Sequence, residues 1–152
     1  MKIIIETDPS ITEPEITIKC KKLDENIMKL QQYLEKDSSR RRVLNLNKSG
    51  TSYYVPVKDI YYFESDGPQV YAHSRDRIFE APFKLYELEG MLGLDFMRVS
   101  KSCIINLRLI YSINRNLTSS SSVEFKASNK IAYISRSYYK AVMERLKEIH
   151  TS

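Results

Sequence analysis

The chain has 152 residues, a net charge of +5 and a sequence pI near 9.1. Its hydrophobic content of 42% is enough for a packed core and too high for a disordered chain. No apolar run approaches membrane-spanning length and no signal peptide is visible, and two widely separated cysteines, Cys20 and Cys103, favour a reduced, cytoplasmic protein with buried thiols over a disulfide scaffold.

The front of the chain predicts a small β-β-α segment. Lys2–Glu6 and Glu15–Lys19 have the composition of short strands, and the second alternates apolar and polar residues. Asp24 suits the N-cap of a helix that extends to about Lys36. Apolar residues recur along this helix at helical spacing, namely Ile27, Met28, Leu30 and Leu34. A segment this small folds poorly alone, so we expect it to pack on the main domain, on a second copy or on a partner.

The polar stretch at residues 37–42, which ends in three arginines, is the best domain boundary. The sequence therefore predicts an N-terminal segment with its linker over residues 1–42 and a main domain over residues 43–152. Residues 1–37 hold six lysines and eight acidic residues, a net charge of −2, whereas residues 38–152 have a net charge of +7. A basic main domain suggests a polyanionic partner, although ordinary solubility charge could also produce it.

From Val43 onward the pattern indicates many short strands separated by turn residues, as in a β-sandwich or small barrel. A short helix is expected over Lys84–Gly90, with Gly90 just past its end, and a longer one over Ser135–His150. The expected strands are Val43–Asn47, Tyr53–Pro56, Ile60–Ser65, Val70–Ser74, Arg77–Ala81, Met97–Val99, Ile104–Asn106, Ile110–Ile113, Val123–Lys126 and Lys130–Tyr133.

The stretch Phe96–Ile110 places a small cationic step, Ser100-Lys101-Ser102, between aliphatic residues of strand type. Strands on both sides would put Lys101 on a short, rigid turn. A cation flanked by two hydroxyls suits a phosphate group or the edge of a base. Taken alone, the same pattern also fits a hairpin with a solvated tip.

No pattern in the chain indicates an enzyme. The nucleophile elbow, the P-loop and the dinucleotide-binding glycine motif are absent, and His73 and His150 do not cluster with the cysteines as metal ligands would. We therefore expect no cofactor, no metal and no small-molecule substrate.

The order of the elements resembles the LytTR family of bacterial DNA-binding domains, from about Val43 to about Lys147. The residues that carry the resemblance are Val55–Ser65 (VPVKDIYYFES), the following glycine turn with its Val-x-Ala-His strand, the helix Leu85–Glu89, the stretch Phe96–Asn106, and Ile134–Tyr138 (ISRSY). The resemblance implies a mostly β fold, an elongated sandwich of short antiparallel sheets with short helices. It also implies binding to direct-repeat DNA sites through loops that enter successive major grooves.

The family's DNA-contacting positions fall on Gln69, Lys101 and Arg136, each on a different turn, and the hydroxyls of Ser100 and Ser102 flank the second of these. Two positions depart from the family, because Gln69 stands where some members have His or Asn and Ser100 stands where His is frequent. For Gln69, simple turn chemistry is nearly as plausible as pairing with adenine.

Other residues in this region are interpreted as structural. We expect Asn106 to satisfy nearby backbone groups and Arg98 to pair within the fold. Adjacent aromatic residues are expected to pack in the core, namely Tyr61, Tyr62, Phe63, Tyr138 and Tyr139.

The resemblance favours a stand-alone transcription regulator that binds double-stranded DNA as a homodimer. Stand-alone relatives are often restrained by a small membrane regulatory protein, which would then be a second partner. Two alternatives stay open: a protein-interaction module whose basic surface is incidental, and an RNA-binding β-domain that stacks bases on aromatic rings.

Overall fold

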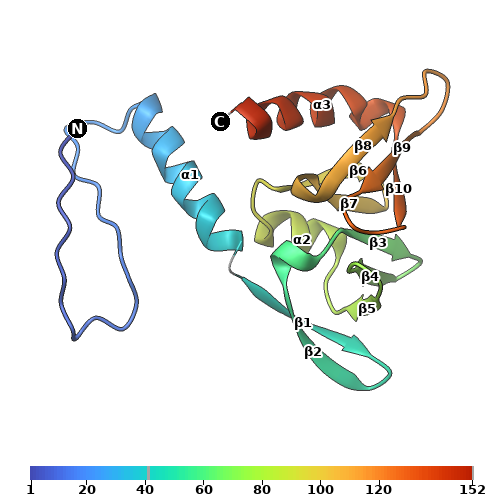
Figure 1. Cartoon of the computed structure of the whole chain (residues 1–152), viewed down its shortest axis with the longest axis horizontal. Coiled ribbons are helices and arrows are strands. Elements are labelled where there is room, and N and C mark those ends of the chain that lie inside the picture. Colours follow the sequence, from blue (N-terminus) through green and yellow to red (C-terminus); the bar gives the residue numbers. More distant parts are fainter. Residues whose placement is uncertain (41, 152) are drawn as a thin grey trace.

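The structure, a computed structural model, describes residues 1–40 and 42–151. Within these residues the chain forms two antiparallel sheets and three helices, α1 (Glu25–Arg40), α2 (Leu85–Met91) and α3 (Arg136–Thr151). Figure 1 shows α1 and the N-terminal segment on one side of the molecule, and the strands with α2 and α3 on the other. The mostly β fold predicted from the sequence is confirmed.

The larger sheet has seven strands in the order β2-β1-β5-β4-β3-β7-β6. Every strand pairs antiparallel with its neighbours, and most neighbours are joined by short turns, so the sheet is assembled largely from hairpins. Its strands are β1 (Val43–Lys48), β2 (Thr51–Pro56), β3 (Tyr62–Asp66), β4 (Gln69–His73), β5 (Ile78–Ala81), β6 (Phe96–Ser100) and β7 (Cys103–Asn106).

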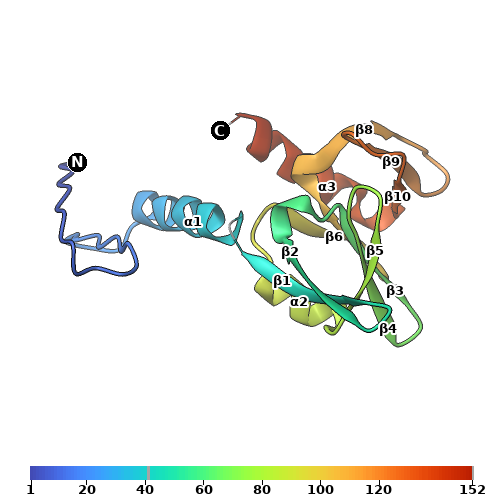
Figure 2. The same ribbon diagram turned by 60° about the horizontal axis from the view of Figure 1, so that its bottom comes forward.

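A second sheet of three strands, in the order β10-β9-β8, packs with α3 against the β6–β7 end of the first. Figure 2 shows the twist of the larger sheet and the smaller sheet beside α3. The strands of the smaller sheet are β8 (Ile110–Asn114), β9 (Ser121–Phe125) and β10 (Ile131–Ile134). Two single 3₁₀ turns, Val57–Asp59 and Leu107–Leu109, lead into β3 and β8.

Two hydrophobic cores lie on this framework. The first packs α2 against the larger sheet around Phe63, Leu46 and Leu88, which are fully buried. The second fills the space between β7, the smaller sheet and α3, with Ile105 and Val142 at its centre. Because both cores meet at β3 and β7, these two strands hold the two halves of the sandwich together.

The two strands predicted near the N-terminus are not formed. Residues 1–24 lie outside both sheets, and their isoleucines are exposed, with Ile3 80% and Ile16 70% accessible. A lone two-stranded hairpin has no second layer to cover its apolar face and is marginal in water. Aligned as a hairpin, Lys2–Glu6 and Glu15–Lys19 would also place like charges opposite each other.

The predicted helix of the front segment is confirmed and is longer than expected. The Asp24 carboxylate caps α1 by accepting from the Ile27 N–H at 2.9 Å. The helix continues to Arg40, so most of the predicted linker is helical, while Arg41 lies outside the described residues. Arg42 donates to the Met91 carbonyl and thereby ties the chain after α1 to the end of α2.

Two smaller predictions are wrong. Gly90 lies inside the last turn of α2, whose C-cap is Leu92, because the chain leaves this helix in an extended conformation that needs no glycine. Cys20 is exposed, since the segment that carries it joins no sheet, whereas Cys103 is buried and burial raises the pKa of its thiol to about 12. Within the described ranges, no helix is long and apolar enough to cross a membrane.

Candidate nucleic-acid interface

The Lys101 turn is the tip of the β6–β7 hairpin. Ser100 pairs with Cys103, so Lys101 and Ser102 form a two-residue turn, and both are exposed. The pairing slips by one residue between Arg98 and Ser100, which makes a bulge at the fully buried Val99. A bulge aims the following residues in a new direction, and here it sets the orientation of the tip.

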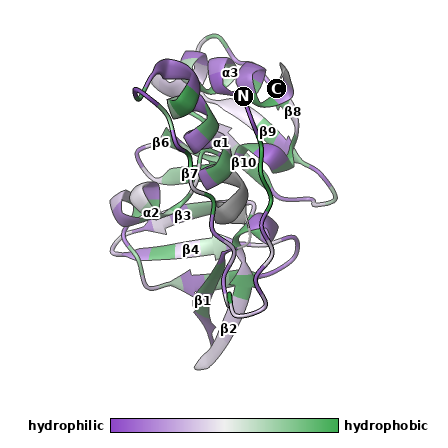
Figure 3. Cartoon of the chain, turned by 90° about the vertical axis from the view of Figure 1, so that its left-hand side faces the viewer, coloured by the Kyte–Doolittle hydropathy of each residue, from purple (hydrophilic) through white to green (hydrophobic). Residues whose placement is uncertain are grey.

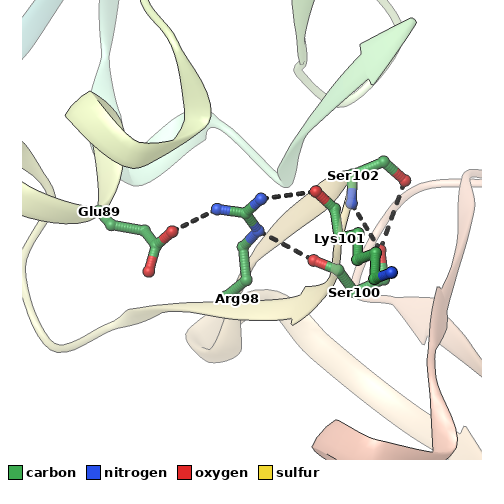
Figure 4. A network of polar contacts seen from close by, with 5 residues as sticks. All are labelled: Glu89, Arg98, Ser100, Lys101 and Ser102. Carbon is green, nitrogen blue, oxygen red and sulfur yellow. Dashed lines mark hydrogen bonds and ion pairs between the residues drawn. The ribbon is translucent and has the colours of Figure 1, made fainter.

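The Arg98 side chain fixes the backbone of this tip through hydrogen bonds. Its Nε donates to the Ser100 carbonyl at 2.9 Å and its Nη2 to the Lys101 carbonyl at 2.5 Å. Its Nη1 pairs with the Glu89 carboxylate on α2 (Figure 4). Ser102 adds a local bond, from its N–H to the Ser100 Oγ at 3.2 Å. The prediction that Arg98 pairs within the fold is confirmed.

The β3–β4 turn lies beside this tip. Gly67 adopts a positive φ of 59° in a two-residue turn between Asp66 and Gln69, a conformation that favours glycine. The Ser65 N–H donates to the Ser102 carbonyl at 2.8 Å and joins the two turns through their main chains.

The Gln69 side chain folds back onto its own sheet. Its Nε2 donates to the Val70 carbonyl at 2.8 Å and approaches the Ala81 carbonyl at 3.4 Å. In this conformation only the amide oxygen is available to a ligand, whereas bidentate pairing with adenine uses both the oxygen and the nitrogen. Simple turn chemistry, the alternative interpretation of Gln69, accounts for the contacts seen here.

The start of α3 completes the group of turns. Ser135 donates its N–H to the Val99 carbonyl at 2.9 Å, and its Oγ approaches the same oxygen at 3.3 Å. Arg136, the first residue of α3, is exposed. An arginine at a helix N-terminus faces the positive end of the helix dipole, and a bound anion there would relieve the repulsion and meet free helix N–H groups.

The structure therefore brings all five sequence-predicted residues to adjacent turns. The bond from Ser65 to Ser102 and the bond from Ser135 to Val99 connect the three segments through the backbone. The β3–β4 turn and the start of α3 lie on the side of the molecule away from α1 (Figure 1). Such an arrangement presents cations on protruding turns, which suits contact with a groove of a duplex.

Arg115 is a further cation at this surface that sequence reasoning missed. Its guanidinium lies over the ring of Tyr139, 4.8 Å from the centroid, close to the first turn of α3. The contact joins the end of β8 to α3 across the fold, so no local pattern reveals it. The tyrosine also packs against the second core, as expected.

Two buried polar groups support the framework behind the turns. The Asn106 amide donates to the Ile60 carbonyl at 3.0 Å and accepts from the Arg108 N–H at 3.1 Å, which confirms its structural interpretation. The His73 ring stacks on Tyr62 with centroids 4.1 Å apart.

His73 also takes part in a polar cluster that bridges the two sheets. Its Nε2 lies 3.0 Å from Glu64 and its Nδ1 lies 3.1 Å from the Lys130 Nζ. Burial and then the Lys130 charge lower the pKa of His73, against the opposing effect of Glu64, and the ring lies between the two side chains. No group of three or more potential metal ligands occurs in the part of the chain that the structure describes.

Comparison with known proteins identifies the domain that carries these turns. The family model of the LytTr DNA-binding domain matches residues 50–147, which include all three turns. The chain belongs to the LytTR family. It therefore contains a DNA-binding domain of a family that is not an enzyme family.

Curated relatives of this LytTR protein match along nearly the whole chain. Two proteins of Staphylococcus aureus, from strains RF122 and NCTC 8325, are each 28% identical over 96% of this chain and 98% of their own. Both are named as uncharacterized HTH-type transcriptional regulators. In the present LytTR chain strands separate the three helices of the described residues, so none of them forms a helix-turn-helix pair.

A solved structure confirms the LytTR fold. A LytTr DNA-binding domain from Bacillus cereus superposes with a TM-score of 0.64 at 22% sequence identity. The superposition covers 69% of this chain and 96% of that domain.

Proposed function

We propose that this LytTR protein is a transcription regulator that binds a direct-repeat site in double-stranded DNA and reads it through the three turns. The observation that carries the proposal is the backbone connection of these turns, which presents Lys101 and Arg136 together on one surface. The Staphylococcus aureus relatives, named as transcriptional regulators, support the regulatory role.

Within this proposal the residues of the turns contribute separately to affinity and to specificity. Lysine and arginine side chains neutralise phosphates and supply most of the affinity, whereas a few contacts to base edges supply specificity. Lys101 and Arg136 are the candidates for both roles, with Ser100 and Ser102 as hydroxyl donors beside them. Arg136 is the first residue of α3, so within this proposal the helix contributes its N-terminal residues and not a long face.

The site itself is tested by selecting bound fragments from random duplex DNA. We expect enrichment of two similar half-sites in the same orientation, about one helical turn or 10–11 base pairs apart. Enrichment of a single-stranded RNA ligand in a parallel selection would favour the RNA-binding alternative. If neither pool is enriched, the protein-interaction module becomes the better interpretation.

Binding to the selected duplex should weaken steeply as salt is raised. Residues 38–152 carry a net charge of +7, and each phosphate contact releases condensed counterions. With several such contacts, affinity should fall by on the order of 10³-fold between 50 and 200 mM salt. Titrations at four or five salt concentrations measure the slope, and an affinity that does not change with salt contradicts the proposal.

We further propose that the protein acts as a homodimer joined through residues 1–24. The isoleucines of this segment are exposed, and Figure 3 shows the hydrophobic stretches along it. The charges of the two strand-like runs favour pairing between identical runs. Lys2 of one copy then lies opposite Glu6 of the other, and Glu15 opposite Lys19, in an antiparallel ladder.

A homodimer of this kind suits a main domain that binds DNA weakly on its own. Two linked copies raise the effective concentration of the second domain once the first is bound, which multiplies affinity. On a direct repeat the two main domains face the same way. The N-terminal pair and the DNA-bound pair then follow different symmetry, which the connection between α1 and β1 must accommodate.

A charge swap tests the dimer. Glu15→Lys should weaken dimerisation because it places a second lysine opposite Lys19 of the other copy, and the double variant Glu15→Lys/Lys19→Glu should restore it by re-creating opposite pairs. Molecular mass by sedimentation measures the effect, with the selected DNA sequence as a control that should not change. A parent protein that is monomeric throughout, or a double variant no better than the single one, argues against this pairing and favours a different partner, such as a membrane regulatory protein.

A further inference from the structure

The guanidinium of Arg98 makes contacts that set it apart from the other cations near the three turns. It is three-quarters buried, with 24% of its side chain accessible. It donates to two successive carbonyls, those of Ser100 and Lys101, and to Glu89 on α2. Figure 4 shows it lying between Glu89 and the tip.

These contacts settle which groups the tip presents to a ligand. A carbonyl oxygen carries partial negative charge and would repel a phosphate. At this tip the Ser100 and Lys101 carbonyls face Arg98, and the Ser102 carbonyl accepts from the Ser65 N–H. All three successive carbonyls already accept hydrogen bonds from the protein. The exposed Lys101 side chain is therefore the charged group that the tip presents to a ligand.

The charge of Arg98 is already compensated. Glu89 neutralises it, and the two carbonyls on the side of the tip accept from two further N–H groups. Three of the five Arg98 N–H groups are already used within the fold, whereas the structure records no partner for the Lys101 side chain. A planar guanidinium can hold two carbonyls and a carboxylate at once, which the single ammonium of lysine cannot do with the same geometry.

We propose that Arg98, held by Glu89, is a positioning residue that fixes the Lys101 turn for recognition of DNA without touching DNA itself. The inference rests on the proposed function, because it assigns Arg98 a role in binding through Lys101. Fixing the turn before binding removes the cost of ordering it on the duplex, so the gain appears as affinity for the specific site.

The test is a double-mutant cycle between Arg98 and Lys101 on the selected duplex. Arg98→Gln should weaken binding about 3- to 10-fold, the usual cost of ordering a side chain on binding. The salt slope should stay unchanged, because no phosphate contact is lost. In a Lys101→Ala background the same substitution should have only the effect of losing one net charge, since the side chain that it positions is gone. Arg98→Lys should bind the duplex more tightly than Arg98→Gln but less tightly than the parent.

A matched control removes the same charge elsewhere. Arg75 is exposed in the β4–β5 turn, at the opposite end of β4 from the Asp66–Gln69 turn. Arg75→Gln should change affinity through net charge alone and to the same extent with or without Lys101. Thermal unfolding of each variant separates loss of binding from loss of folded protein.

The outcomes distinguish this inference from the proposed function. If Lys101→Ala alone leaves binding unchanged, the assignment of the DNA-facing turn fails. If Lys101→Ala weakens binding but Arg98→Gln weakens it equally in both backgrounds, Arg98 acts on the fold as a whole and the inference is overturned. A salt slope that falls by about one unit in Arg98→Gln would show that Arg98 binds phosphate directly, which also overturns it.

Discussion

Replacing both Lys101 and Arg136 by alanine is expected to abolish high-affinity binding to the selected duplex while leaving the protein folded. Each side chain lies exposed on a separate turn and carries little packing, so neither loss should unfold the domain. If both contact base edges, each loss should cost on the order of 1–3 kcal/mol on the specific site and much less on random DNA. The two costs should roughly add, because the residues share no side-chain contact that the structure records.

A different pattern is expected if the two cations contact only phosphates. Specific and random duplexes should then weaken alike, and the salt slope should fall by about one unit per residue. Binding titrations on both duplexes, with circular dichroism of each variant, distinguish the two cases. Gln69→Ala is the neutral comparison and should leave the slope unchanged, with at most a relaxed preference at one base pair. A folded double variant that binds its site as tightly as the parent would show that DNA is bound elsewhere.

Replacing Asn106 by alanine is expected to destabilise the fold more than any of these surface substitutions. Asn106 is 2% accessible, and its side chain joins the Ile60 carbonyl to the Arg108 N–H. Its removal leaves two polar groups without their partner and opens a small cavity, at a cost of about 2–4 kcal/mol in the free energy of unfolding.

Denaturant unfolding measures this effect. Asn114→Ala removes the same group from an exposed position at the end of β8, and we expect it to change stability by less than about 0.5 kcal/mol. Under conditions where Asn106→Ala is still folded, it should keep the base preference of the parent, because residue 106 lies at the end of β7 away from the tip. Equal stability of the two variants would show that the buried amide does not support the fold.

Local sequence patterns predicted most of the strands and all three helices of the described residues. Alternating apolar residues located the strands, and Asp24 located the start of α1 through its capping carboxylate. The resemblance placed Arg136 at the first residue of α3, where the structure has it. These features depend on neighbours within a few residues, which a single sequence contains.

Features that depend on distant segments could not be predicted in the same way. The apolar patterns at Lys2–Glu6 and Glu15–Lys19 are typical of strands, yet no strand forms there, because a lone hairpin of the two runs is marginal in water and would place like charges opposite each other. Gln69 carries the amide donor and acceptor that can pair with a base, but its amide nitrogen is turned towards the carbonyls of Val70 and Ala81. The contact between Arg115 and Tyr139 crosses the fold and has no local signature.

The backbone bonds that join the three turns have a consequence for how this protein family can change. The bond from Ser65 to Ser102 and the bond from Ser135 to Val99 both use main-chain N–H and carbonyl groups, which every residue except proline supplies in full. The side chains at the tips can therefore be exchanged while the scaffold beneath them keeps its shape. A regulator built in this way can acquire a new operator through a few substitutions at its turns, and a designer could transplant the three tips as a set.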